Sequence, residues 1–120
     1  MSKQKKVLIV EDDVFWTEKW RKGLNNNKVS IEVADSIEKA ESLLKKYRFD
    51  AIIMDCSLKN DKEIMTFSLL NKVRSVINYR GPIIASSSSS TYRKEMMKRG
   101  CSHETSKSGV ILKLAEVLYF

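Results

Sequence analysis

The stretch Ala51–Leu58 constrains the fold more than any other part of the chain. It is an apolar run that ends abruptly at Asp55. Such a run is typical of a strand that is buried on both faces, with its last residue emerging at the edge of the sheet. A second run, Val7–Val10, ends in the same way at Glu11-Asp12-Asp13. In open α/β sheets, functional sites lie at the carboxyl ends of the strands. If the two strands are parallel neighbours, their carboxylates should therefore meet in one crevice.

The rest of the chain alternates between strand-like and helix-like segments. Strands are predicted at about 7–10, 29–33, 50–55, 82–85 and 101–106, the last of them mainly from its place in the order. Apolar residues recur at helical spacing after each strand: Trp16, Trp20 and Leu24; Ile37, Ala40, Leu43, Leu44 and Tyr47; Ile64, Phe67, Leu70, Val73 and Ile77; Tyr92, Met96 and Met97; Ile111, Leu114, Ala115 and Leu118. Five such units predict an α/β fold, with one five-stranded parallel sheet, right-handed crossovers and helices on both faces.

Local signals give some of the boundaries. Asp13 can cap the first helix, and Asp35 with Glu38 has the spacing of a capping box for the second. Gly100 is a natural end for the fourth helix. Asn25-Asn26-Asn27 is a turn signal, residues 57–63 are polar and loop-like, and the last helix is predicted to run to Phe120.

Length and composition favour a single domain over residues 1–120, with a sizeable core. No apolar run approaches the roughly 20 residues that span a bilayer, so no membrane partner is expected. Two cysteines make no disulfide framework, which favours a reduced, cytoplasmic setting. The net charge is +7, but the basic residues are scattered and no aromatic-interleaved motif accompanies them. This pattern favours a solvated surface over binding to nucleic acid.

Several motifs together resemble the receiver domain of two-component response regulators. They are the run Val7–Asp13, Asp55 after an apolar strand, a hydroxyl residue after Pro82-Ile83-Ile84, and a lysine seven residues beyond Gly100. The resemblance covers essentially the whole chain and implies a flavodoxin-like (βα)5 sandwich. It also implies that Asp55 accepts a phosphoryl group from the phosphohistidine of a histidine kinase or phosphotransfer protein, with Mg²⁺ required.

The resemblance also implies roles for the surrounding residues. Asp12 would ligate the metal directly with Asp55, Glu11 would act nearby or through water, and the backbone carbonyl of Ser57 would complete the protein ligands. Lys107 would pair with the phosphoryl oxygens, as would a hydroxyl among Ser86–Ser88, of which counting from Pro82 selects Ser87. The chemistry of the residues agrees, because crowded carboxylates repel unless a cation neutralises them, and Mg²⁺ prefers oxygen ligands.

Three departures from the family pattern stand out. Ser108 follows Lys107, where the family has a proline joined by a cis peptide; a cis bond to a non-proline residue costs about 3 kcal/mol, which favours a trans bond and a different direction for Lys107. Glu104 occupies the position of the switch aromatic, and a charged side chain cannot bury itself in the same cavity. The loop Lys59–Glu63 lacks the familiar proline and glycine and is longer. An atypical conformational readout is therefore expected.

Two functional readings remain open, and a third is disfavoured. The first is a phosphoacceptor, stand-alone or within a phosphorelay, that switches a protein-interaction surface and is not an enzyme, although it assists its own phosphorylation and dephosphorylation. The second is a degenerate receiver acting as a phosphorylation-independent interaction module, which Glu104 and Ser108 favour. A flavodoxin or a haloacid-type phosphatase fits poorly, because Glu11-Asp12-Asp13 would repel a bare phosphate and Ser57 stands where the phosphatase needs a second aspartate. The kinase, the target and the oligomeric state stay open.

Overall fold

A computed structural model describes residues 4–24, 28–59 and 64–120. Five parallel strands form one sheet in the order β2-β1-β3-β6-β7. The strands are β1 (Lys5–Val10), β2 (Val29–Ala34), β3 (Ala51–Asp55), β6 (Ile83–Ser86) and β7 (His103–Thr105). The helices are α1 (Val14–Gly23), α2 (Ile37–Lys46), α3 (Phe67–Ser75), α4 (Ser90–Arg99) and α5 (Val110–Leu118). A two-stranded antiparallel ribbon joins β4 (Ser57–Leu58) to β5 (Ile64–Met65), and a short 3-10 turn, η1 (Lys107–Gly109), precedes α5.

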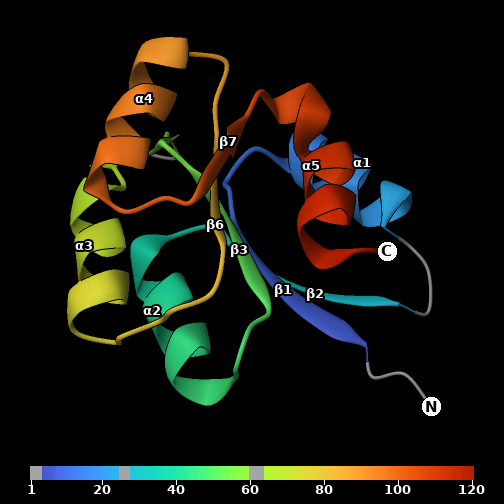
Figure 1. Cartoon of the computed structure of the whole chain (residues 1–120), viewed down its shortest axis with the longest axis horizontal. Helices are drawn as coiled ribbons and strands as arrows, with labels where there is room; N and C mark the ends of the chain where they lie inside the picture. The colour runs from blue at the N-terminus through green and yellow to red at the C-terminus, as the bar shows by residue number, and fades with distance from the viewer. Residues whose placement is uncertain (1–3, 25–27, 60–63) are drawn as a thin grey trace.

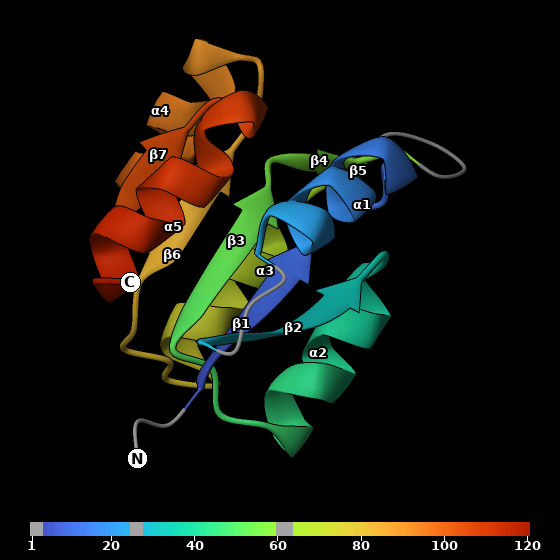
Figure 2. The same cartoon turned by 90° about the vertical axis from the view of Figure 1, so that its right-hand side faces the viewer.

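The helices cover both faces of the sheet, as Figures 1 and 2 show, with α2, α3 and α4 on one side and α1 and α5 on the other. Successive strand residues point to opposite faces, so each strand supplies both cores. Leu8, Ile52 and Met54 pack with the α2–α4 layer, and their neighbours Ile9 and Ile53 pack with the α1–α5 layer. The predicted fold class, a five-stranded parallel sheet with helices on both faces, is confirmed.

Two caps agree with the local signals, and a third differs. The Asp13 side chain accepts a hydrogen bond from the Phe15 N–H and caps α1. Gly100 ends α4 with a φ of 133°, a backbone conformation that favours glycine. The cap of α2 is Ser36 and not Asp35, since the Ser36 hydroxyl accepts from the Lys39 N–H at 3.1 Å. Ser36 directly precedes the first helical residue, so its hydroxyl is the one that reaches the free N–H groups of the first turn.

Several boundaries differ from those predicted. Helix α3 begins at Phe67, because Ile64 and Met65 pair with Leu58 and Ser57 as a ribbon, and it ends at Ser75 before Ile77. Residues 57–58 are therefore strand and not loop. Strand β7 is shorter than 101–106, and α5 ends at Leu118, where Tyr119 is left-handed with a φ of 59°. The predicted turn at residues 25–27 and part of the predicted loop, residues 60–63, lie outside the described residues.

The register of the central strands positions the site. Val10 pairs with Met54 between β1 and β3, so Glu11 emerges beside Asp55. Asp55 pairs in turn with Ser86 of β6, and Ser86 pairs with Thr105 of β7. The carboxyl ends of four strands therefore meet at one edge, the position at which ligands bind in open α/β sheets. Within the described residues, no helix is both long and apolar enough to cross a membrane.

Candidate functional site

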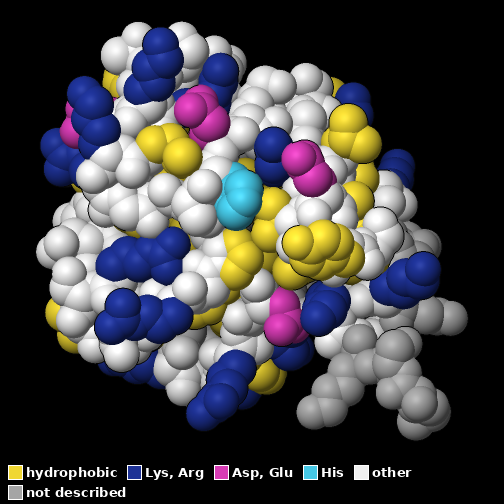
Figure 3. All heavy atoms as spheres, in the orientation of Figure 1, with side chains coloured by type: hydrophobic (Ala, Val, Ile, Leu, Met, Phe, Trp, Pro, Cys, Tyr) yellow, Lys and Arg dark blue, Asp and Glu magenta, His cyan; other side chains and the backbone are white. Residues whose placement is uncertain are grey.

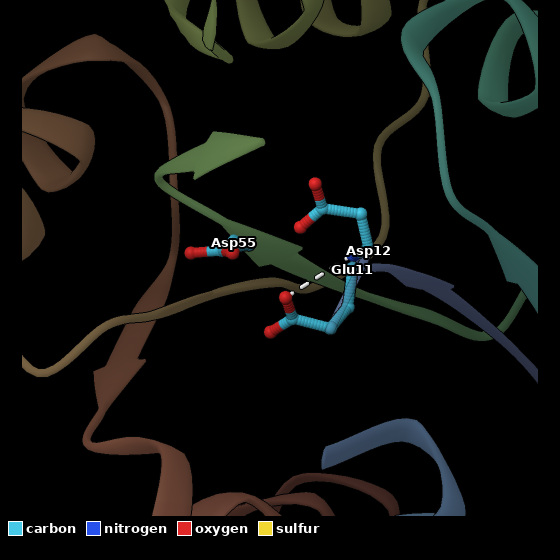
Figure 4. Close-up of side chains that lie close together, drawn as sticks. All are labelled: Glu11, Asp12 and Asp55. Atoms are coloured by element: carbon cyan, nitrogen blue, oxygen red, sulfur yellow. Dashed lines mark hydrogen bonds between the residues drawn. The ribbon is translucent and has the colours of Figure 1, made fainter. Parts of the chain in front are cut away.

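Three carboxylates converge at the carboxyl edge of the sheet. One oxygen from each of Glu11, Asp12 and Asp55 lies within 4.8 Å of the others. Figure 4 shows the carboxyl groups of Glu11 and Asp12, just beyond β1, both pointing toward the side on which Asp55 lies at the end of β3. Glu11 is 1% exposed and Asp55 is 5% exposed. Burial strengthens the repulsion between carboxylates, so this cluster calls for a neutralising cation.

Lys107 supplies one positive charge to the cluster. Its Nζ lies 2.7 Å from Oε1 of Glu11 and 3.2 Å from Oδ2 of Asp55. The peptide bond between Lys107 and Ser108 is trans, as the serine favours. The expectation that Lys107 would point in a different direction is wrong, since its side chain points directly at Asp55.

The backbone around Lys107 explains why the side chain reaches the site. The indole Nε1 of Trp20 donates a hydrogen bond to the Lys107 carbonyl at 3.1 Å. Trp20 is almost fully buried in the α1–α5 core. A large buried side chain thus anchors η1 above the sheet edge. Sequence reasoning placed Trp20 in the core but gave no sign of this polar contact.

The charges shift each other's protonation equilibria. Burial, followed by the charge of Asp55, raises the pKa of Glu11 from 4.5 to about 7, although Lys107 opposes the shift. Burial alone would lower the pKa of Lys107, but its hydrogen bond to Glu11 and the charge of Asp55 raise it above its ordinary value. The lysine is therefore a firmly charged ammonium at neutral pH. Glu11 therefore takes up a proton more readily than an ordinary glutamate does.

Backbone N–H groups hold the first two carboxylates in place. Oε2 of Glu11 accepts from the N–H groups of Asp12 and Asp13 at 3.1 and 3.2 Å. Oδ2 of Asp12 accepts from the Lys59 N–H at 2.5 Å. The Asp12 contact joins the end of β1 to the segment that follows β4. The acidic residues are therefore oriented before any ligand arrives.

Thr66 is a buried residue of the site that sequence reasoning missed. Its hydroxyl lies 2.7 Å from the Asp55 carbonyl and 3.2 Å from the Cys56 carbonyl, and its N–H donates to the Cys56 carbonyl at 3.1 Å. These bonds tie the end of β3 to the start of α3. A threonine directly before an apolar helical repeat is a start signal. The signal was obscured because the helix was predicted to begin at Ile64.

Three residues of the serine run line the pocket of Asp55, and the hydroxyl of a fourth is buried outside it. A cavity of about 410 Å³ is lined by the acidic residues together with Ser57, Ser87 and Lys107. The Ser86 hydroxyl is fully buried and has no hydrogen-bond partner among the described residues. The structure therefore brings Ser87, Ser88 and Ser89 to the same pocket as Asp55, and the Ser89 hydroxyl also caps α4.

Glu104 lies beside this pocket without lining it. It belongs to β7, and its Oε1 is 3.1 Å from Nε of Arg93 in α4. The side chain of Glu104 is 36% exposed, so it does not fill a buried cavity. The charge is instead satisfied by an ion pair across the surface between two elements.

Cys56 follows Asp55 but is a poor nucleophile in this setting. Burial, together with the charge of Asp55, raises the pKa of its thiol to about 11. A thiol with this pKa is almost entirely protonated at neutral pH, and the thiolate is the reactive form. Among the buried groups at the end of β3, the reactive candidate is the Asp55 carboxylate.

Comparisons with known proteins agree with this geometry. The family model described as the response regulator receiver domain matches residues 7–118. A comparison with curated proteins finds no match. Similar solved structures include a two-component response regulator from Clostridium difficile, at 21% identity and a TM-score of 0.79, with 97% of each chain covered.

Two further similar structures contain a metal ion. A receiver domain of a sensor histidine kinase from Pseudomonas aeruginosa, with a magnesium ion coordinated in its active site cleft, is 19% identical with a TM-score of 0.79, and 98% of this chain and 99% of that chain are covered. A response regulator from Burkholderia pseudomallei with a phosphorylated aspartic acid, a calcium ion and citrate is 19% identical with a TM-score of 0.79, and 96% of this chain and 66% of that chain are covered. At these identities the likeness shows the fold, whereas the family match covers nearly all of the sequence. The chain belongs to the response regulator receiver domain family of two-component signalling.

Proposed function

We propose that Asp55 accepts a phosphoryl group, in a Mg²⁺-dependent reaction, from the phosphohistidine of a histidine kinase or phosphotransfer protein. The single observation that carries this proposal is the meeting of Glu11, Asp12 and Asp55 with Lys107 in one pocket. A buried aspartate with a purely structural role needs only one charged or hydrogen-bonding partner to stabilise its carboxylate. A nucleophilic carboxylate that receives a dianionic group needs several positive charges and oxygen ligands around it.

The transfer needs little from the protein beyond a positioned nucleophile. A carboxylate oxygen of Asp55 forms a bond to phosphorus while the bond from phosphorus to the imidazole nitrogen of the donor breaks. The electron pair of the broken bond stays on the imidazole nitrogen, which takes up a proton, so that the donor leaves as neutral imidazole. Lys107, at 3.2 Å from Asp55, is placed to balance the charge that gathers on the phosphoryl oxygens.

The donor set fits Mg²⁺, which takes oxygen ligands and usually one or two protein carboxylates in addition to phosphoryl oxygens and water. Asp12 and Asp55 would hold the ion directly, the backbone carbonyl of Ser57 would add a third oxygen, and Glu11 would act nearby or through water. When bound, the ion would supply charge neutralisation at the phosphoryl group. The magnesium in the cleft of the Pseudomonas aeruginosa domain supports this assignment.

The partners follow from the same assignment. Beyond its phosphodonor, the protein would act on a downstream protein target through a surface that responds to the charge at Asp55, in the cytoplasm. On the face seen in Figure 3, lysine and arginine side chains are spread over the surface and form no single patch. This distribution supports a protein partner over nucleic acid.

Intact-mass measurement tests the proposal. The protein is incubated with acetyl phosphate, with and without Mg²⁺, alongside the Asp55→Asn variant. The expected result is a gain of one phosphoryl group by the wild type only, and only with Mg²⁺. An unchanged mass of the wild type with every donor would support the alternative, a phosphorylation-independent interaction module.

A further inference from the structure

Arg93 connects three segments that converge beside the Asp55 pocket. From α4, its Nη1 donates to the carbonyl of Ser87 in the loop after β6, at 2.6 Å. Its Nε donates to Glu104 in β7 at 3.1 Å. The Arg93 side chain is only 18% exposed. Charge-assisted hydrogen bonds in a partly desolvated setting are stronger than those of exposed pairs, so these contacts can hold the loop.

Ser87 is restrained through each of its polar groups. Its N–H donates to the Thr105 carbonyl at 3.3 Å, its carbonyl accepts from Arg93, and its hydroxyl accepts from the Ser89 N–H at 3.0 Å. A hydroxyl that accepts one bond can still donate its own hydrogen to an oxygen. Because Ser87 lines the pocket of Asp55, its backbone position determines where that hydrogen can be donated.

We infer that Arg93 is a positioning residue for phosphoryl transfer: oriented by Glu104, it fixes the Ser87 carbonyl and so places the Ser87 hydroxyl opposite Asp55. This inference rests on the proposed function of Asp55. Glu104 stands three residues before Lys107, where the resembled family has an aromatic side chain. In this protein an ion pair links β7 to α4, and the hydrogen bond from Arg93 to the Ser87 carbonyl extends that link to the loop after β6.

The ion pair makes the link sensitive to salt. Glu104 is about one-third exposed, so ions in solution screen its interaction with Arg93. The hydrogen bond from Arg93 to the Ser87 carbonyl does not depend on a second charge. Loss of Glu104 should therefore matter most at low ionic strength, and loss of Arg93 should matter at any ionic strength.

A double-mutant cycle tests the inference through the rate of phosphorylation by acetyl phosphate, followed by intact mass. Arg93→Met should slow the reaction about tenfold when Ser87 is present, and by less than about twofold in the Ser87→Ala background. Glu104→Gln keeps an oxygen acceptor for Nε and should retain most of the rate. Arg99→Met is the matched control, since Arg99 also lies in α4 and pairs with Glu95 at 2.8 Å, and its loss should leave the rate unchanged.

A role limited to stabilising the fold would give a different pattern. Equal losses in Arg93→Met and Arg99→Met, or the same loss from Arg93→Met with and without Ser87, would overturn the inference. Amide hydrogen exchange gives a second readout that needs no phosphoryl transfer. Arg93→Met should speed exchange at the Ser87 and Ser89 amides about tenfold, whereas Arg99→Met should not.

The two readouts separate failure of the inference from failure of the proposed function. If the wild type accepts no phosphoryl group, the proposed role of Asp55 is wrong, and the exchange measurement alone decides whether Arg93 holds the loop. If the wild type is phosphorylated and the exchange at Ser87 and Ser89 is unchanged in Arg93→Met, the role of Asp55 stands and the inference about Arg93 is wrong.

Discussion

The ammonium of Lys107 lies 3.2 Å from Oδ2 of Asp55, although the lysine is followed by a serine through a trans peptide bond. Two other contacts orient the lysine. The Trp20 indole donates a hydrogen bond to the Lys107 carbonyl, and the Lys107 ammonium donates one to Glu11. Lys107 therefore places its positive charge at Asp55 without a cis peptide bond to the residue that follows it.

Replacing Lys107 should slow phosphorylation of Asp55 without abolishing the fold. Lys107→Met keeps the length of the side chain but removes the ammonium, and loss of one such charge from a transition state costs about a hundredfold in rate. The rate of mass gain with acetyl phosphate and Mg²⁺ measures the effect. Lys113→Met is the matched control, because Lys113 belongs to α5 and pairs with Glu116. A similar loss in both variants would contradict the assigned role.

The raised pKa of Glu11 predicts a pH-dependent stability in the absence of Mg²⁺. Its pKa is about 7 in the folded protein and 4.5 as the unperturbed value, so the folded state binds the proton more tightly. This contribution to stability is complete below about pH 4.5 and is lost as pH rises through 7.

Glu11→Gln should remove this dependence. In EDTA, the free energy of unfolding of wild type relative to Glu11→Gln should fall by on the order of 2 kcal/mol between pH 4.5 and 8. Urea unfolding at several pH values measures it. Glu18→Gln, at an exposed position of α1, is the control and should run parallel to wild type. A difference that grows in the opposite direction would contradict the assignment.

Mg²⁺ should stabilise the protein through Asp12. A ligand that binds only the folded state raises the melting temperature, and the rise grows with the logarithm of the ratio of ligand concentration to dissociation constant. Asp12→Asn removes one carboxylate ligand and should weaken Mg²⁺ affinity about 10- to 100-fold. Thermal unfolding across a Mg²⁺ titration measures the shift, and Asp50→Asn, at the other end of β3, should keep the wild-type response. An undiminished response in Asp12→Asn would show that the ion binds elsewhere.

Thr66 should contribute to stability through its hydroxyl. Thr66→Val keeps the shape but leaves the Asp55 carbonyl without its 2.7 Å hydrogen bond in a buried setting, which costs about 1–3 kcal/mol. Thr66→Ser should recover most of the loss, because it restores the donor. Denaturant unfolding measures both variants. If valine and serine are equally destabilising, the hydroxyl is not what holds the end of β3.

The central sheet could be predicted from the sequence because its apolar runs are buried on both faces. Two continuous apolar runs, Val7–Val10 and the run before Asp55, are typical of strands in the interior of a parallel sheet. Once these strands pair in register, the carboxylates at their ends lie side by side. The short edge strand β7, with the sequence His-Glu-Thr and half-buried side chains, has no such pattern. The ribbon of two-residue strands β4 and β5 is too short to show any periodicity.

The contacts that connect the site to its surroundings could not be predicted from the sequence, for a different reason. Arg93 and Glu104 belong to separate elements, and either residue alone is an ordinary surface charge. Trp20 and Thr66 have strong local explanations, as a core residue and as a helix start, which hide their hydrogen bonds to Lys107 and Asp55. Polar contacts between elements depend on how the layers pack, and the pattern within one element does not contain that information.

The most direct test of the central claim is the location of the phosphoryl group. Borohydride reduces an acyl phosphate to an alcohol, so treatment of the phosphorylated protein followed by peptide mass mapping marks the residue that carried it. We predict modification at Asp55 alone, dependent on Mg²⁺ and absent from Asp55→Asn. Modification at another residue, or a phosphorylated Asp55→Asn variant, would contradict the account.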